Sequence, residues 1–322
     1  MAKKILVAGG AGYIGSHVQK QLLEEGFDVL IYDNLSSGDK INVLKDSQFI
    51  EGDILDKKRL NEAMSQGIDG VVHLAAKKAV GDSMIYPEIY AENNISGSIN
   101  ILNAMSDNGV KHIVFSSSAA VYGMPEYIPI DENHPINPIN YYGYTKLAIE
   151  QNMAWYAKLG RLNYAALRYF NAVGYAADKS ITGRERQSQN LMPIVMETAT
   201  GKREKFSIYG RDYDTPDGTC IRDYVHVSDL ARAHTIAMRK LMDGAQSFAV
   251  NLGTGKGTSV TEIVEATEKV IGKKLNYDYG PRRPGDPAIL TAKADKAFEL
   301  LGWKPEYTNV EDIIRTVWNL EI

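Results

Sequence analysis

A tyrosine and a lysine at helical spacing could form a general base in this chain. Tyr142 and Lys146 stand in a run that begins at about Tyr142 and continues to Ala157 with few helix breakers. Residues i and i+4 of a helix share one face, so the phenol and the ammonium become neighbours. A nearby cation favours phenolate and lowers the pKa of a tyrosine towards working pH. A surface tyrosine and a solvated lysine give the same spacing, so the pair needs support from other residues.

A run of small hydroxyl side chains gives part of that support. Ser116, Ser117 and Ser118 follow the apolar segment 113–115, which is typical of a buried strand. The carboxyl ends of parallel strands are where such sheets bind ligands. Ser118 could therefore hydrogen-bond a reacting oxygen, although a polar turn at a strand end has the same pattern.

A glycine-rich turn near the N-terminus predicts a dinucleotide site. Gly9, Gly12 and Gly15 lie between an apolar run and a segment of helical pattern, 17–23. The first glycine permits a tight turn, the second lets the backbone approach a pyrophosphate, and the third allows close helix packing. The N-terminus of the helix then offers N–H groups to phosphate oxygens. An ordinary glycine-rich βα turn would look similar.

An acidic residue after the second apolar run supports the nucleotide hypothesis. Asp33 follows Gly15 by 18 residues, near the spacing at which a carboxylate accepts hydrogen bonds from the adenosine ribose. No Lys or Arg occurs between Asp33 and Lys40, and a carboxylate repels a 2′-phosphate, so NAD is favoured over NADP. Asp53 follows a third apolar run and could lie beside the adenine ring, or cap the next helix.

Short apolar runs alternate with segments of helical period through the first half of the chain. The runs are 5–8, 29–32, 71–74, 113–115 and 165–169. This rhythm is typical of βα units around a parallel sheet. We expect an α/β fold with a doubly wound parallel sheet of the Rossmann type and a smaller, discontinuous C-terminal α/β lobe for the substrate. The expected boundaries are 1–172, with 222–257 returning to the first domain, and 173–221 with 258–322 for the second.

Two later segments are expected to rejoin the first sheet. Residues 224–231 have the pattern of a strand followed by a helix, with Ser228 or Asp229 as its N-cap, and residues 248–252 have the pattern of another strand. A helix is expected over 260–270 and a last amphipathic helix from about Val310.

Composition and charge narrow the class of protein. The formal net charge is −4 without long basic runs, so neither nucleic acid nor a membrane surface is a favoured partner. No apolar run reaches the roughly 20 residues that span a bilayer. Cys220 is the one cysteine, and the six histidines lack metal-ligand spacing. We therefore expect a cytoplasmic enzyme with a small-molecule ligand and no metal.

Together these motifs resemble the extended short-chain dehydrogenase/reductase family, in particular its NAD-dependent epimerases and dehydratases. The resemblance extends from Gly9 to Trp303. Beyond the glycine turn, the serine run and the Tyr-Lys pair, it is carried by five further segments: 73–83 (HLAAKKAVGDS), 92–94 (ENN), 167–171 (LRYFN), 222–227 (RDYVHV) and 282–286 (RRPGD).

The resemblance implies roles for individual residues. Ser118, Tyr142 and Lys146 would be catalytic. The NAD contacts would be Gly9, Gly12, Tyr13, Ile14, Gly15, Asp33, Asn34, Asp53, Ile54, Leu74, Ala75, Ala76, Lys78, Asn93, Ser116, Tyr142, Lys146 and Phe170. The nucleotide-sugar contacts would be Lys78, Ser118, Tyr142, Asn171, Asn190, Leu191, Ser207, Tyr209, Arg222, Arg283, Asp286 and Leu290.

The resemblance also implies a reaction. Tyr142 would take the proton of a sugar 4-hydroxyl while NAD takes hydride from C4, and the 4-keto sugar would turn before the hydride returns. UDP-glucose and UDP-galactose are the expected substrates, with tightly bound NAD and a homodimer. Leu290 stands where the family has either a bulky aromatic or a small residue that governs room for an N-acetyl group, so acceptance of UDP-N-acetylhexosamines stays open. UDP-pentoses and UDP-uronic acids are alternative substrates. A dehydratase would need an Asp-Glu pair where Ala119 and Ala120 follow Ser118. A non-catalytic NAD(H)-binding protein is the remaining alternative.

Overall fold

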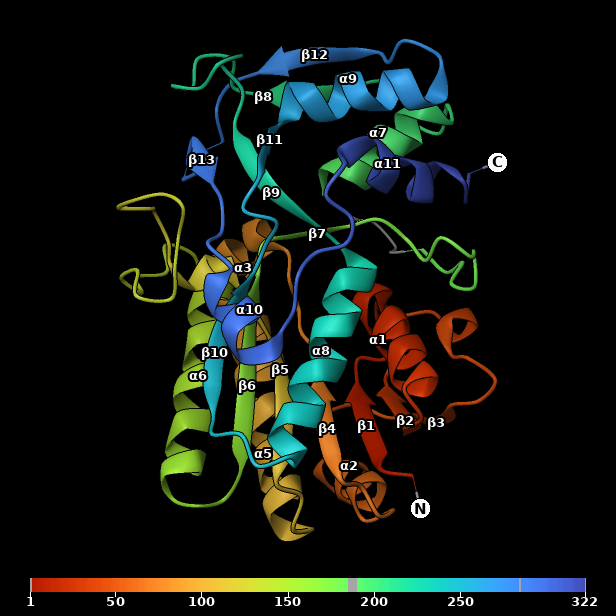
Figure 1. Ribbon diagram of the computed structural model, residues 1–322, viewed down its shortest axis with the longest axis vertical. Helices are drawn as coiled ribbons and strands as arrows, with labels where there is room; N and C mark the ends of the chain where they lie inside the picture. Colours follow the sequence, from red (N-terminus) through yellow and green to blue (C-terminus); the bar gives the residue numbers. More distant parts are fainter. Residues whose placement is uncertain (1, 185–189, 284, 322) are drawn as a thin grey trace.

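A parallel sheet of seven strands forms the centre of the first domain. The structure is a computed structural model that describes residues 2–184, 190–283 and 285–321. The strand order is β10-β6-β5-β4-β1-β2-β3, with every neighbouring pair parallel (Figure 1). The bounds are β1 Lys4–Ala8, β2 Asp28–Asp33, β3 Gln48–Glu51, β4 Gly70–His73, β5 His112–Ser118, β6 Asn163–Tyr169 and β10 Phe248–Leu252. The doubly wound Rossmann arrangement is confirmed, and its topological switch point lies between β1 and β4.

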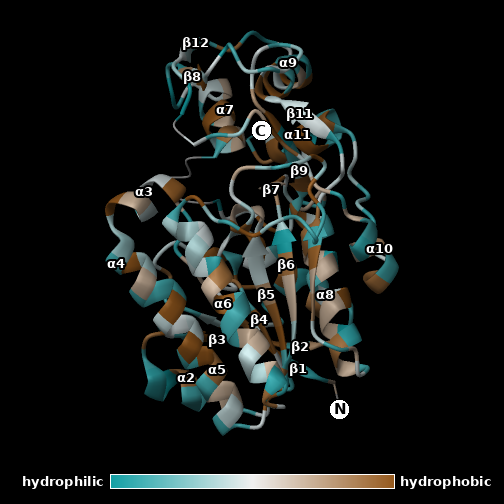
Figure 2. Cartoon of the chain, turned by 90° about the vertical axis from the view of Figure 1, so that its left-hand side faces the viewer, coloured by the Kyte–Doolittle hydropathy of each residue, from teal (hydrophilic) through white to brown (hydrophobic). Residues whose placement is uncertain are grey.

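Helices cover both faces of this sheet and enclose two hydrophobic cores. Helices α1 (Tyr13–Glu24) and α8 (Val227–Met242) bury Val18, Leu22 and Met238 against one face. Helices α2 (Lys57–Met64), α5 (Gly97–Asp107) and α6 (Tyr141–Lys158) bury Leu60, Met105 and Met153 against the other. Figure 2 shows the sheet between these two layers. The shorter elements of this half are α3 Val80–Ile85, α4 Pro87–Tyr90, a π-helix Ala91–Ser96, and 3₁₀ turns Lys40–Asn42 and Ala119–Val121.

A smaller lobe lies at the carboxyl edge of the sheet (Figure 1). Its elements are β7 Asn171–Val173, α7 Leu191–Ala199, β8 Phe206–Tyr209, β9 Ile221–His226, β11 Gly257–Ser259, α9 Val260–Ile271, β12 Tyr277–Gly280, β13 Ile289–Leu290 and α11 Val310–Trp318. Helix α10 (Asp295–Leu301) instead packs against β10 and α8 of the first domain. Helices α7, α9 and α11 surround its own apolar clusters. Within the described ranges, no helix is long and apolar enough to cross a membrane.

One predicted strand pairing was wrong. Strand β10 joins the large sheet beside β6, as expected, but β9 belongs to a second sheet with β7, β11 and β13. The sequence pattern at 224–231 predicts a strand followed by a helix without specifying the partner of the strand. In the structure, β7 leaves the end of β6 and pairs with β9, so the chain enters the second lobe along this strand pair.

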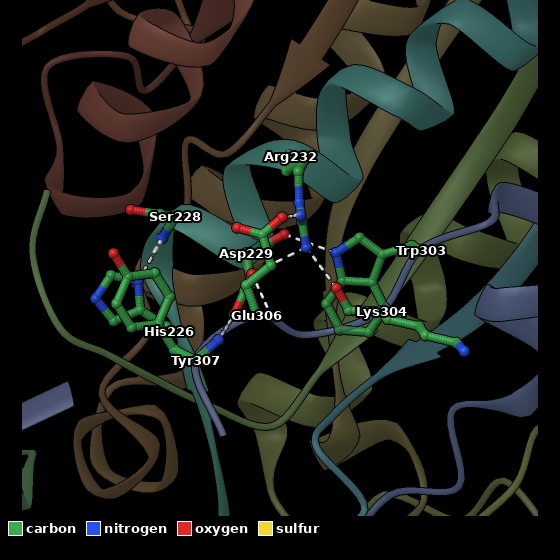
Figure 3. Close-up of polar contacts among 8 residues, drawn as sticks. All are labelled: His226, Ser228, Asp229, Arg232, Trp303, Lys304, Glu306 and Tyr307. Carbon is green, nitrogen blue, oxygen red and sulfur yellow. Dashed lines mark hydrogen bonds and ion pairs between the residues drawn. The ribbon is translucent and has the colours of Figure 1, made fainter. Parts of the chain in front are cut away.

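The start of α8 anchors the C-terminal segment to the first domain. The N-cap of α8 is His226, whose ring accepts from the Ser228 N–H, so the predicted cap at Ser228 or Asp229 was wrong. Asp229 is buried and accepts hydrogen bonds from the backbone N–H groups of Glu306 (2.9 Å) and Tyr307 (3.0 Å) (Figure 3). Arg232 donates to the same carboxylate, and the indole of Trp303 donates to the Asp229 carbonyl.

Replacing Asp229 by alanine is expected to destabilise the protein by about 2–4 kcal/mol, because three donors lose a buried charged acceptor. Urea unfolding measures the loss, and hydrogen exchange should show faster opening of α11, which follows the anchored segment. Asp243→Ala is the matched control, since Asp243 lies exposed at the other end of α8. An equal loss of stability in both variants would contradict the anchoring role.

Candidate active site

Helix α6 carries the predicted catalytic pair at the carboxyl edge of the sheet. The helix begins after Asn140, whose side chain accepts from the Gly143 N–H at 2.8 Å. Tyr142 is half-buried and Lys146, one turn later, is buried. The Lys146 Nζ lies 5.7 Å from the centre of the Tyr142 ring. The predicted juxtaposition of phenol and ammonium is therefore present.

Lys146 is a buried cation held by the neighbouring strand. Its Nζ donates to the Ser116 carbonyl at 2.7 Å and lies 4.9 Å from the centre of the Phe115 ring. Burial lowers the pKa of Lys146 to about 7, and the charge of Glu150 opposes this shift. Near neutral pH the ammonium can therefore both hold and release a proton.

The pKa of Tyr142 differs from the prediction. We expected the adjacent cation to lower it, but burial dominates and raises the pKa of Tyr142 to about 12, while a hydrogen bond from Ser118 opposes the rise. The physical reason is that burial removes water from the phenolate, and desolvation disfavours the charged form. Further positive charge at the phenol would be needed to bring its pKa towards neutrality.

The three serines at the end of β5 face different partners. Ser118 Oγ accepts from the Ala120 N–H at 3.2 Å and bonds to Tyr142, so it lies where the reacting oxygen is expected. The Ser116 hydroxyl bonds to the Tyr169 hydroxyl, and Ser117 donates to Glu150. Ser118 thus reaches the phenol directly, and Ser116 meets Lys146 through its carbonyl.

Asn94 organises the site and was missed as a functional residue. It is buried in the π-helix, and its amide pairs with both the N–H (2.8 Å) and the carbonyl (2.9 Å) of Lys77. It also donates to the Thr145 hydroxyl at 3.1 Å, next to Lys146. Asn94 therefore ties the loop that carries Lys78 to α6. The motif at 92–94 was a signal for it, but only Asn93, which donates to Asn94, was predicted.

The glycine turn after β1 fits a dinucleotide. Gly9 has φ +84°, and a Cβ there would meet the Ala75 nitrogen at 2.6 Å, so this turn and the 74–76 loop pack closely at the switch point. A Cβ on Gly15 would lie 2.2 Å from the Gly9 carbonyl oxygen. Among the described residues, no side chain caps α1 at Gly12, so its N-terminus can face a phosphate.

Asp33 lies at the end of β2 beside this turn. Its buried carboxylate accepts from the Ala11 N–H at 3.0 Å and the Leu35 N–H at 2.8 Å. Asn34 donates to Asp53 at 2.7 Å, which brings together two residues predicted for the adenosine. Burial raises the pKa of Asp33, and its two backbone donors oppose the rise. An acceptor thus stands near the glycine turn, as an adenosine ribose requires, so the residues present fit NAD.

Replacing Asp33 by asparagine is expected to weaken NAD binding at least about tenfold, because a charged acceptor is lost. Calorimetric titration of NAD into cofactor-free protein measures this. Asp28→Asn serves as control, since Asp28 is exposed at the opposite end of β2. Unchanged NAD affinity in Asp33→Asn would remove Asp33 from the cofactor site.

The second lobe brings the predicted nucleotide-sugar residues near one another. Arg222 on β9 pairs with Asp286 at 3.0 Å, and the Arg283 guanidinium lies 4.2 Å from the centre of the Tyr209 ring. Asn171 on β7 donates to the Asp223 carbonyl at 3.2 Å, beside Arg222. Two guanidinium groups, a carboxylate and an exposed aromatic ring suit a diphosphate, a ribose and a base.

The remaining predicted substrate residues have structural contacts. Ser207 bonds to Asp278 across the β8–β12 pair, and Leu191 packs into the core of the lobe. Asn190 is the exposed N-cap residue of α7. Leu290 pairs in register with Arg222 and packs with Phe170. No group of three or more possible metal ligands occurs among the residues that the structure describes.

Sheet order, glycine turn and the Tyr-Lys helix define a dinucleotide-binding enzyme of the extended short-chain dehydrogenase/reductase class. The chain belongs to the NAD dependent epimerase/dehydratase family, which it matches over residues 5–253. It is 46% identical to UDP-glucose 4-epimerase of Lactobacillus helveticus over 316 residues, 98% of this chain and 96% of that enzyme.

Solved structures are similar over the same length. The crystal structure of UDP-glucose 4-epimerase from Brucella ovis in complex with NAD has a TM-score of 0.95 and 44% identity, covering 98% of this chain and 97% of the other. The Stenotrophomonas maltophila UDP-glucose 4-epimerase with bound NAD and formylated UDP-arabinopyranose has a TM-score of 0.95 and 41% identity, covering 99% and 98%.

Proposed function

We propose that this enzyme interconverts UDP-glucose and UDP-galactose by oxidising and re-reducing C4 of the sugar. The observation that carries the proposal is the meeting of Tyr142, Lys146 and Ser118 at the same carboxyl edge of the parallel sheet as the glycine turn. Full-length similarity to UDP-glucose 4-epimerases supports the same substrate class. NAD, when bound, would supply a hydride acceptor and a positive charge.

Tyr142, Ser118 and Lys146 have different roles in the proposed reaction. The Tyr142 hydroxyl oxygen takes the proton of the 4-hydroxyl, and Ser118 bridges the two oxygens. Lys146 holds a positive charge beside the phenol, which favours the phenolate. Tyr142 returns the proton to the sugar oxygen after the 4-keto sugar has presented its other face.

A turning sugar requires a firmly held nucleotide. We assign the nucleotide to the second lobe, residues 173–221 and 258–322 together with β9 and its Arg222, and the cofactor to residues 1–172 with the rest of 222–257. Arg222 and Arg283 bind the diphosphate, and Asp286 accepts from the ribose. Binding energy is then concentrated on UDP while the hexose stays loosely held.

The outer face of α6 supports a homodimer. Tyr144, Trp155 and Leu159 are 49%, 60% and 69% exposed on this helix, which lies on the outside of the molecule (Figure 2). Such an apolar stripe is usually covered by a partner, and a second copy of the chain is the partner we propose. Sedimentation of the protein tests this. We place the enzyme in the cytoplasm, where the buried Cys220 thiol stays reduced.

The test of function is incubation of purified protein with UDP-galactose, without added cofactor and with added NAD. UDP-glucose formed without added cofactor supports epimerisation with retained NAD. If UDP-galactose stays unchanged in NAD-loaded protein, the galactose proposal fails. UDP-N-acetylhexosamines, UDP-pentoses and UDP-uronic acids are then tested, since Leu290 leaves their fit open.

A further inference from the structure

A buried ion pair adjoins the catalytic lysine on the same helix face. Tyr142, Lys146 and Glu150 follow one another at four-residue spacing along α6. Glu150 is buried and accepts two hydrogen bonds from Arg168 on β6, from Nε at 3.0 Å and from Nη2 at 2.5 Å. It also accepts from the Ser117 hydroxyl, between the serines that contact Lys146 and Tyr142. The carboxylate therefore joins α6 to two strands of the sheet.

The pair is held from its other side by a chain of buried polar groups. Arg168 Nη1 donates to the Tyr122 hydroxyl at 3.0 Å, and that hydroxyl donates to Asn251 Oδ1 at 2.6 Å. The Asn251 amide donates to the Ile130 carbonyl at 3.0 Å. Each member is satisfied, as a buried network must be to hold one geometry. The network spans α6, β6, β10 and the 122–130 loop.

We propose that Glu150, held by Arg168, is a positioning residue for Lys146: it fixes the catalytic face of α6 against β5 and β6, and its carboxylate keeps the buried ammonium charged. The proposal rests on the proposed function, in which the charge of Lys146 favours the Tyr142 phenolate.

Glu150 supplies the charge that acts on the buried Lys146 against the effect of burial. The titratable or charged groups of the surrounding elements are Tyr142 and Glu150 on α6, His73 on β4, Arg168 and Tyr169 on β6, and Tyr90 on α4. From β5, Lys146 meets only the Phe115 ring and the Ser116 carbonyl. Burial lowers the pKa of His73 to about 3, so its ring is neutral. Glu150 is then the anion one turn from Lys146 on α6, and Arg168, which pairs with Glu150, is the cation that offsets the charge of this carboxylate.

Three variants separate electrostatic control from simple packing. Glu150→Gln removes the anion and leaves Arg168 unbalanced, so the titration midpoint of Lys146 should fall by about one pH unit or more. Arg168→Met leaves the carboxylate unbalanced, so the midpoint should rise. The double variant removes both charges and should lie between the single variants. If Glu150 and Arg168 only pack, the titration midpoint of Lys146 should stay unchanged in all three variants or shift in the same direction in all of them.

The readout is the ¹³Cε resonance of labelled lysine in NAD-free protein, assigned with Lys146→Arg. Exposed Lys158 on the same helix is the internal control. Opposite shifts in the two single variants support the proposal, and an unmoved midpoint in folded variants overturns it. If Glu150→Gln does not fold, as judged by circular dichroism, Arg168→Met and the double variant decide alone. Failure of the wild-type protein to epimerise would refute the proposed function and leave this titration as an independent result.

Discussion

Replacing Tyr142 by phenylalanine is expected to lower the rate of UDP-galactose conversion by about 10³-fold. The variant keeps the ring that packs beside Lys146 but loses the oxygen that takes and returns the proton. Water at this position is a far weaker base than a phenolate, so it cannot take over the role of the lost oxygen. Initial rates of UDP-glucose formation measure the loss, and NAD content should be unchanged.

Tyr144→Phe is the matched control for this experiment. Tyr144 lies two residues further along α6, exposed on its outer face, so its hydroxyl should not contribute. Comparable activity of Tyr142→Phe and wild type would remove Tyr142 from the reaction. An equal loss in Tyr144→Phe would instead indicate a general effect on α6.

Replacing Lys146 by methionine is expected to abolish activity and yet stabilise NAD-free protein below about pH 7. The unfolded chain keeps Lys146 protonated up to its ordinary pKa of 10.5, whereas the folded protein releases the proton near 7. Between these values the folded state binds fewer protons, so its stability rises with pH. The cost of the buried cation is therefore fully present below pH 7 and disappears towards pH 10.5. We expect a gain on the order of 2 kcal/mol at pH 6, after loss of the bond to Ser116.

Urea unfolding of both proteins from pH 6 to pH 10 measures the difference. Lys158→Met is the control, since Lys158 is exposed at the end of the same helix and should give no pH-dependent gain. A gain that is constant with pH would mean that packing, and not the buried charge, explains it. A loss at pH 6 would show that the Ser116 bond outweighs desolvation.

The expected opposition between stability and activity has a structural reason. Lys146 is placed in a site that disfavours its charge, and Glu150 and Arg168 hold the helix that carries it there. A site that buries an ammonium group, so that its pKa falls to near 7, lowers the stability of the folded protein, because desolvation of an ammonium is unfavourable. Proteins tolerate such costs at functional positions.

The sequence by itself determined the features that depend on local spacing. Short continuous apolar runs predicted the strands of the large sheet, since strands buried on both faces leave such runs in the residue order. The scarcity of helix breakers up to about Ala157 predicted α6. The turn at Gly9–Gly15 and the acidic Asp33 predicted the cofactor edge, because a φ of +84° and close backbone approach need glycine. The resemblance to a known family predicted which residues of the second lobe contact the nucleotide sugar.

Only the tertiary structure decided which groups meet across the fold. A strand pattern at 224–231 cannot specify the partners of β9, so its place in the second sheet was not predicted. The Asp229 anchor and the Glu150–Arg168 pair join residues far apart in the chain, and no local pattern marks them. The motif at 92–94 contains Asn94 but does not show that Asn94 contacts Lys77 and Thr145. The pKa of Tyr142 also depends on burial, which raises it. Long-range contacts and desolvation are properties of the packed molecule, and residue spacing does not contain them.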